Sequence, residues 1–351
     1  NAVADPTKHN AIDPICRLLL MIYRCGEHQF QDSIAIVGGD LFPPLLAAIF
    51  LSRSNKDMYN SAVALMERLV RNKIDLRDVP WSRGLLDLFQ EIIETADLGT
   101  HGEPIALVVT WMVEGLLLQR ENNKIFLMEH PRLFESMVAK FANTFHPGCV
   151  VNVAVCRFMK ILALSTTNRL LMVKSLHFLR LLFLLLHDDC IDTQKIVFEI
   201  LTLSSSDRMG RTRIFGFLDH KFLEIATKAL DQPSLRENSL SFLTELVVDI
   251  PGKILSSKRP NLVRDLTKQA MLGEAHSQQA AQVVVQLAKS LSVNNGKGDL
   301  LDAILDLCNA KDIRIRVEGA NALLAQAQSR PACSFFIVHV PEATAMLAKM
   351  L

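Results

Sequence analysis

Aromatic residues, glycine and proline are all scarce in this chain of 351 residues. Aromatic side chains make up 6% of it, with two Trp and two Tyr, and there are only 15 Gly and 13 Pro. A β-sheet protein needs more aromatic and β-branched residues in its strands, and more turn formers between them. Leu, Ala, Glu, Lys and Met dominate instead, and these residues favour helices. We therefore predict an all-α protein.

An excess of charge of one sign is also lacking. The formal net charge is +1, whereas a dedicated nucleic-acid binder has a clear basic excess or stripe. Uninterrupted apolar runs are lacking too. The most apolar stretch, residues 170–186, contains Lys174, His177 and Arg180, which argues against a membrane span. We therefore expect no membrane partner and disfavour a nucleic-acid partner.

The cysteines of the chain form no CxxC pair and stand mostly in apolar helical context. The seven are Cys16, Cys25, Cys149, Cys156, Cys190, Cys308 and Cys333. A reduced cysteine in such a place behaves as a small hydrophobic residue. We expect a reducing compartment, the cytoplasm or the nucleus.

One fragment recurs along the chain. In each copy a small or polar residue precedes a basic residue and an aliphatic one, and an apolar pair follows eight residues after the aliphatic residue. The aliphatic anchors are Ile125, Leu170, Ile214 and Ile254. The apolar pairs are Leu133-Phe134, Phe178-Leu179, Phe222-Leu223 and Leu262-Val263, with a further apolar residue at Met137, Leu182, Ala226 and Leu266. Spacings of 45, 44 and 40 residues between the anchors are typical of two- or three-helix repeats.

A long amphipathic helix precedes most of these anchors. Its apolar residues recur at helical spacing, and turn-forming residues separate it from its neighbours. The predicted helices cover residues 61–71, 105–119, 150–164, 193–203, 237–248, 277–291 and 315–327. One unit cannot bury its apolar face alone, so stacked neighbours must share a continuous core.

The pattern resembles the armadillo repeat. In that family a long third helix patterned like A-x-W-A-L-x-N-L-A precedes a loop with an Asn and a basic residue, and two shorter helices follow. The segment from Trp111 to Leu117 is similar to it, and residues 195–201, 241–247 and 282–288 share its apolar spacing. HEAT repeats are the structural alternative. The resemblance implies one right-handed α-solenoid over residues 1–351, with about seven to eight repeats, best defined over 104–291.

In nuclear-import receptors of the armadillo family, the Trp and Asn positions of the third helix form a ladder that grips extended basic peptides. The Trp positions map here to Ala64, Trp111, Cys156, Lys195, Ser241, Gln282 and Asn321. The Asn positions map to Arg68, Gly115, Lys160, Glu199, Glu245, Gln286 and Ala325. Only Trp111 keeps the ladder residue, so the import-receptor function is disfavoured.

What the mapping leaves is a concave groove of mixed charge. Its candidate partner-binding residues are Arg68, Trp111, Lys160, Lys195, Glu199, Glu245, Gln286 and Asn321. Such a groove suits a peptide with acidic and basic blocks. For any one of these residues the alternative is an ordinary solvated helix position, or a core position in the case of Trp111.

No pattern of catalytic residues is present. There is no phosphate-binding Gly-rich loop, GxSxG or HExxH motif, and the ten His residues lack metal-ligand spacing. His187-Asp188-Asp189 follows an apolar helix, and we interpret it as a charged loop or helix end rather than an acid–base or metal cluster. We expect no catalytic residue, metal, cofactor or small-molecule substrate.

Three functions are compatible with these features. The leading hypothesis is a scaffold or adaptor that holds a segment of another protein in the concave groove. The second is a regulator of an enzyme, such as a small-GTPase exchange factor, because some armadillo proteins act in this way. The third is a helical-repeat nucleic-acid binder, which the near-neutral charge and the few aromatic residues disfavour.

Overall fold

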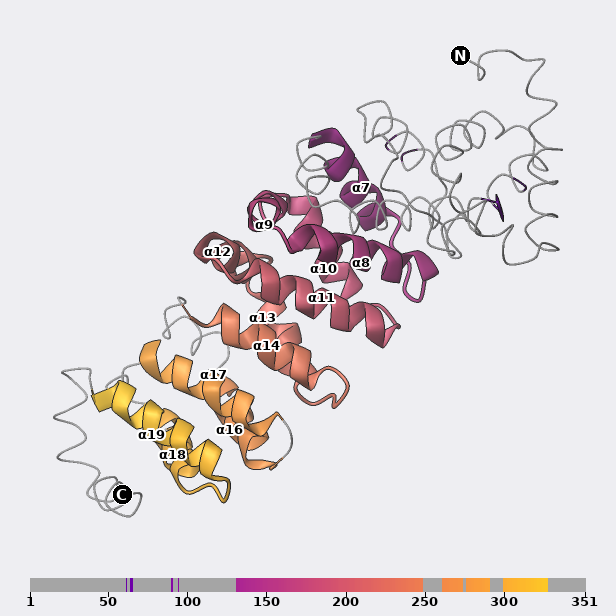
Figure 1. Ribbon diagram of the computed structural model, residues 1–351. Helices are drawn as coiled ribbons and strands as arrows, with labels where there is room; N and C mark the ends of the chain where they lie inside the picture. Colours follow the sequence, from indigo (N-terminus) through magenta and orange to yellow (C-terminus); the bar gives the residue numbers. More distant parts are fainter. Residues whose placement is uncertain are drawn as a thin grey trace, which may run out of the picture. The chain divides into compact units, whose positions relative to one another are not determined.

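The structure is a computed structural model that describes residues 131–248, 261–273, 276–290 and 299–327, together with residues 61, 64, 65, 90 and 94. Within these residues the regular structure is entirely α-helical, in twelve helices with defined bounds (Figure 1). None of these helices combines the length and the apolar character that crossing a membrane requires. The all-α fold predicted from composition and periodicity is confirmed.

The chain divides into two compact units, residues 1–196 and 197–351, and the boundary falls inside a helix. Both units are built from a long helix that follows a shorter one across a tight turn. We call the long helices third helices: α8 (Val150–Ala163), α11 (Ile191–Ser204), α14 (Arg236–Leu246), α17 (Ser277–Ser290) and α19 (Ile313–Ala327). The second helices before them are α7 (Pro131–Asn143), α10 (Leu176–Leu185), α13 (Lys221–Ala229), α16 (Leu262–Met271) and α18 (Asp299–Cys308). Short first helices are α9 (Thr166–Met172) and α12 (Arg208–Gly216).

The third helices match their predicted ranges to within about two residues at each end. The prediction of 277–291, for example, becomes Ser277–Ser290, and 150–164 becomes Val150–Ala163. The predicted helices at 61–71 and 105–119 lie outside the described ranges. A single solenoid of seven to eight repeats over the whole chain stays a prediction.

The second helices bury the recurring apolar residues. Met137, Leu182, Ala226 and Leu266 are each fully buried. In the first unit Phe134 of α7 packs on Phe178 of α10, with ring centroids 6.1 Å apart. In the second unit Phe198 of α11 packs on Phe242 of α14 at 6.2 Å. The repeat seen in the sequence is therefore a repeat of core positions.

Arginine side chains close four of the turns between consecutive helices. In each turn the guanidinium donates to a carbonyl oxygen six residues upstream, at or just beyond the end of the preceding helix. The pairs are Arg169 to Ala163 (3.0 Å), Arg211 to Ser205 (2.9 Å), Arg236 to Leu230 (2.9 Å) and Arg316 to Ala310 (3.0 Å). The last carbonyls of a helix have no partner inside it, so these bonds satisfy groups that would otherwise need water.

The basic residue of the sequence repeat occupies two different places in the two first helices. Arg169 of the α9 copy closes a turn, whereas Arg213 of the α12 copy is exposed and Arg211 takes the equivalent role. Accordingly the buried Met172 of α9 corresponds to Ile214 of α12. The register of the anchors is therefore wrong by two residues at α12.

The segment from Arg211 to Phe222 is two residues longer than the segment from Arg169 to Phe178, and this difference accounts for the shift. Both the helix α12 and the turn that follows it are longer than their counterparts around α9. Leu218, Asp219 and His220 all have positive φ, at 44°, 55° and 72°, a conformation that costs a non-glycine residue roughly 1–2 kcal/mol. Nδ1 of His220 donates to the carbonyl oxygen of Phe215 at 2.7 Å, and the two rings lie 4.1 Å apart. These contacts hold the turn in place.

Candidate functional site

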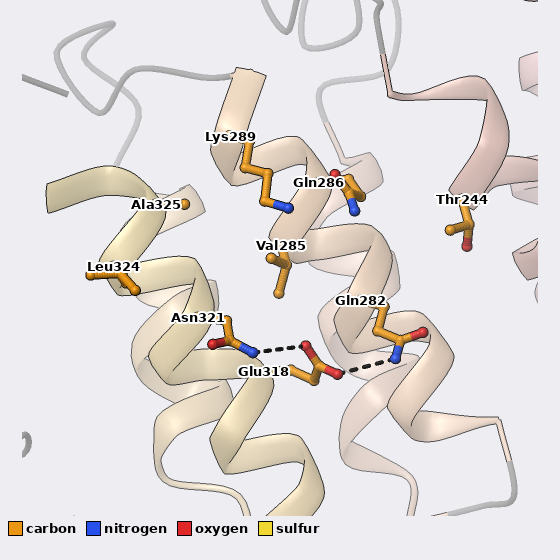
Figure 2. A pocket seen from close by; sticks show the side chains of 9 residues that line it. All are labelled: Thr244, Gln282, Val285, Gln286, Lys289, Glu318, Asn321, Leu324 and Ala325. Carbon is orange, nitrogen blue, oxygen red and sulfur yellow. Dashed lines mark hydrogen bonds between the residues drawn. The ribbon is translucent and has the colours of Figure 1, made fainter. Parts of the chain in front are cut away.

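The third helices α14, α17 and α19 of the second unit lie side by side (Figure 1). The buried stripe of α17 consists of Ala280, Ala281, Val283, Val284, Leu287 and Ala288. Because small apolar residues fill one side of this helix, its polar residues gather on the other side. There they border a hollow of about 380 Å³. Its lining residues are Thr244, Gln282, Val285, Gln286, Lys289, Glu318, Asn321, Leu324 and Ala325 (Figure 2).

Side-chain amides tie the three helices together around the hollow. Nε2 of Gln282 donates to one carboxylate oxygen of Glu318 at 3.1 Å, and Nδ2 of Asn321 donates to the other at 3.4 Å (Figure 2). On the other flank of α17, Nε2 of Gln279 donates to the hydroxyl of Ser241 on α14 at 2.8 Å. The amides of Gln282 and Asn321 keep their carbonyl oxygens for another partner, because only their NH₂ groups are used in these bonds.

Two contacts on the buried side of α19 fix its position against α17 and α18. Nε2 of Gln326 donates to the carbonyl oxygen of Ala288 on α17. Gly319 lets α19 approach α18 closely, because a Cβ there would lie 2.7 Å from the backbone nitrogen of Cys308. These two contacts hold the Glu318 side of the hollow in a set register against α17.

The hollow has opposite charges at its two ends. Glu318 lies beside Gln282, in the middle of α17, whereas Lys289 follows seven residues later, near the end of that helix (Figure 2). Seven residues of α-helix span about 10.5 Å. The hydrogen bonds to Glu318 come from neutral amides, so they orient its charge without cancelling it.

Apolar surface adjoins the hollow on α19. Ile313, Val317 and Leu324 are 60%, 50% and 58% exposed, and their spacing of four and seven residues places them on one face of the helix. Leu324 also lines the hollow, as does the buried Val285 (Figure 2). An apolar ligand group that contacts Leu324 would remove apolar surface of both groups from water, and this burial is favourable.

Two of the candidate residues named from the sequence, Gln286 and Asn321, line the hollow. So do Gln282 and Ala325, which were mapped to the same two ladder positions. The four lie on the neighbouring third helices α17 and α19, and their part in binding a partner stays a prediction.

The remaining candidates lie elsewhere. Glu199 on α11 and Glu245 on α14 are half-buried in the second unit and do not line this hollow. Lys160 on α8 and Lys195 on α11 are half-buried in the first unit. Arg68 and Trp111 lie outside the described residues.

Sequence reasoning missed the two charged residues of the hollow. Lys289 lies seven residues after Gln282, on the same helix face, so extending the ladder by one turn finds it. Glu318 precedes Asn321 by three residues and shares its face in the same way. Thr244, Val285 and Leu324 carry no signal of their own, because a single third helix does not show which neighbour completes the hollow.

The thiol of Cys156 is inaccessible and a poor nucleophile. Cys156 is fully buried, and burial, followed by the nearby Asp188 and Cys190, raises the pKa of its thiol well above the usual value. Asp188 itself is 1% exposed, and its carboxylate accepts a hydrogen bond from the backbone N–H of Gly148. His187-Asp188-Asp189 follows the end of α10, as predicted for a charged loop or helix end. Asp188 is nevertheless buried and links two turns.

No group of three His, Cys, Asp or Glu side chains placed to hold a metal ion occurs in the part of the chain that the structure describes. The described residues thus add no metal-binding candidate to the hollow between the third helices.

No protein-family profile matches the chain, and no curated protein shows significant sequence similarity to it. Two engineered proteins solved by the Northeast Structural Genomics Consortium are similar in structure, both at 13% identity. One has a TM-score of 0.59 over 93% of this chain and 82% of the other. The second has a TM-score of 0.53 over 68% of this chain and 96% of its own. At such identity the likeness shows the fold alone, and the chain is an all-α solenoid of helical repeats.

A designed armadillo repeat protein in complex with the peptide (KR)4 aligns over 81% of this chain and 98% of its own. Its identity is 13% and its TM-score 0.38.

Proposed function

We propose that the protein is a non-catalytic scaffold of armadillo type that holds an extended segment of another protein against its third helices. The observation that carries this proposal is the hollow between α14, α17 and α19. It combines amides that still have free carbonyl oxygens, two charges and exposed apolar surface. The ladder positions Gln282, Gln286, Asn321 and Ala325 meet there.

Extended peptide is the ligand class that suits this lining best. A peptide backbone presents alternating N–H and C=O groups, and each Gln or Asn side chain carries both a donor and an acceptor. Thus Gln286 and the free carbonyl oxygens of Gln282 and Asn321 offer partners for a main chain. We propose a reducing compartment, the cytoplasm or nucleus, because the described cysteines are free thiols, three of them buried.

Site-specific photo-crosslinking in the full chain tests the proposal. A photoreactive amino acid is placed at Gln286, inside the hollow, or at Lys268, an exposed residue of the second helix α16. After irradiation in cell extract, mass spectrometry maps the partner residues attached at each position. We expect the Gln286 position to label one continuous segment of a partner protein.

The Lys268 position is the matched control, because it is exposed and helical but outside the hollow. Asn321→Arg fills the hollow from the α19 side, so it should abolish labelling at Gln286. Equal labelling at the two positions, or labelling at Gln286 that survives Asn321→Arg, would place the binding surface elsewhere.

A further inference from the structure

The two charges of the hollow have no counter-ion among the described residues. Neither Lys289 nor Glu318 forms an ion pair with any of them. The bonds to Glu318 come only from the neutral amides of Gln282 and Asn321. Each charge is therefore available for a ligand group of opposite sign, one beside the middle of α17 and one near its end.

The geometry points to a specific partner chemistry: an extended peptide with a basic, an apolar and an acidic residue at alternate positions. This inference rests on the proposed peptide-binding function and adds the order of charges to it. The basic side chain pairs with Glu318, the apolar one covers Val285 and Leu324, and the acidic one pairs with Lys289 (Figure 2).

The dimensions of the hollow fit this spacing. Residues that alternate in an extended chain point to the same side, about 6.6 Å apart, so the outer two of three lie about 13 Å apart. Gln282, which contacts Glu318, and Lys289 lie about 10.5 Å apart along the axis of α17. The flexible side chain of Lys289, which is exposed, covers the remaining distance because it extends several ångströms beyond its Cα atom.

Selection of a peptide with one basic and one acidic residue requires both Glu318 and Lys289. A hollow that selected basic peptides alone would present carboxylates at both ends, and one that selected acidic peptides alone would present cations. The Glu318 carboxylate is also held in place by two amide donors from two different helices, so little side-chain freedom is lost when a cation binds to it.

Fluorescence anisotropy with defined peptide probes tests the inference. The mixed probe contains Arg-Ser-Leu-Ser-Glu flanked by Gly and Ser residues. Three companions contain Arg at both charged positions, Glu at both, or Ser at both. With the wild-type chain at low ionic strength, we expect the mixed probe to bind more tightly than the Ser probe, and neutralising either peptide charge to weaken binding about two- to fivefold.

Reversing the charge of Lys289 or of Glu318 should change which probe binds most tightly. Lys289→Glu makes both ends of the hollow acidic, so this variant should prefer the double-Arg probe over the mixed one. Glu318→Lys makes both ends basic and should prefer the double-Glu probe; the amides of Gln282 and Asn321 can rotate to accept from the new ammonium group. Lys268→Glu, the same charge change outside the hollow, should leave the order of the probes unchanged.

The outcomes separate this inference from the proposed function. The inference is overturned if the wild-type chain binds all four probes equally or none of them, or if the reversals do not change the preferred probe. A change of preference produced equally by Lys268→Glu would show a general charge effect and also overturn it. Photo-crosslinking of a partner at Gln286 tests the proposed function independently of these affinities.

Discussion

Replacing Gly210 by alanine is a direct test of how tightly the turn between α11 and α12 is packed. A Cβ at this position would lie 1.7 Å from the carbonyl oxygen of Ser204 and 3.0 Å from its carbonyl carbon. Ordinary contacts begin near 3.4 Å, and the obstructing atoms belong to the backbone. A side-chain rotation therefore cannot relieve the clash, and the end of α11 or the start of α12 must move.

That movement also breaks two hydrogen bonds of the turn. The backbone N–H of Gly210 donates to the N-cap carboxylate of Asp207 at 2.8 Å, and Arg211 donates to the carbonyl oxygen of Ser205 at 2.9 Å. Overpacking costs about 1–3 kcal/mol, and a weakened intramolecular hydrogen bond about 0.5–1.5 kcal/mol. We therefore expect Gly210→Ala to lower the free energy of unfolding by about 2–6 kcal/mol.

Gly216 provides the matched control in the same helix. It is helical, its φ is not positive, and a Cβ there meets nothing within 4 Å. Alanine at this position reduces the entropy of the unfolded chain and should stabilise by about 0.4–1 kcal/mol. Urea unfolding followed by circular dichroism gives both values. If both variants unfold at the same urea concentration as the wild type, the close approach of α11 and α12 is not a feature of the folded protein.

Three further predictions concern single residues. Arg236→Met should lower the free energy of unfolding by about 1–3 kcal/mol, because the carbonyl of Leu230, just beyond the end of α13, loses its donor; urea unfolding measures this, and an unchanged midpoint would contradict it. The pKa of Glu224 is lowered from 4.5 to about 2 by hydrogen bonds from Lys221 and Lys228. The ionised Glu224 therefore stabilises the fold above pH 4.5, and this stabilisation is lost as the pH falls toward 2. NMR titration of Glu224 should show the low midpoint, and 1 M salt should move that midpoint back toward 4.5. Cys156, which is buried with a raised thiol pKa, should resist iodoacetamide until the protein unfolds, as peptide mapping will show; rapid alkylation of the folded chain would be inconsistent with its burial.

The sequence predicts the third helices well because their apolar residues recur at helical spacing over three to four turns. The ends of α17 and α8 were predicted almost to the residue. The first helices are shorter, and there the pattern was misread. Relative to α9 and its turn, α12 and the turn after it contain extra residues, and these shift the chain without disturbing the apolar pair Phe222-Leu223 that follows. Two extra residues in one repeat shift its register. The apolar pair that follows keeps its own pattern, so the sequence alone does not reveal the shift.

The candidate site was predicted in part. Gln286 and Asn321 were found because each occupies the same position on its own third helix. Glu318 and Gln282 are 36 residues apart in the sequence and form a hydrogen bond. That contact depends on the position of α19 against α17, which the apolar pattern of a single helix does not determine. The burial of Asp188 was missed for a related reason. Its partner, the N–H of Gly148, belongs to the backbone of a turn 40 residues earlier.

The arginines that close the turns have a consequence for how the repeats diverge. Each of them bonds a carbonyl only six residues upstream, so every such turn is stabilised by residues of its own segment and does not depend on a neighbouring repeat. The side chains that border the hollow take no part in these bonds. Substitutions among those lining residues therefore leave the turns intact, and the ligand preference of the surface is free to change from one repeat to the next while the stacking of the helices persists.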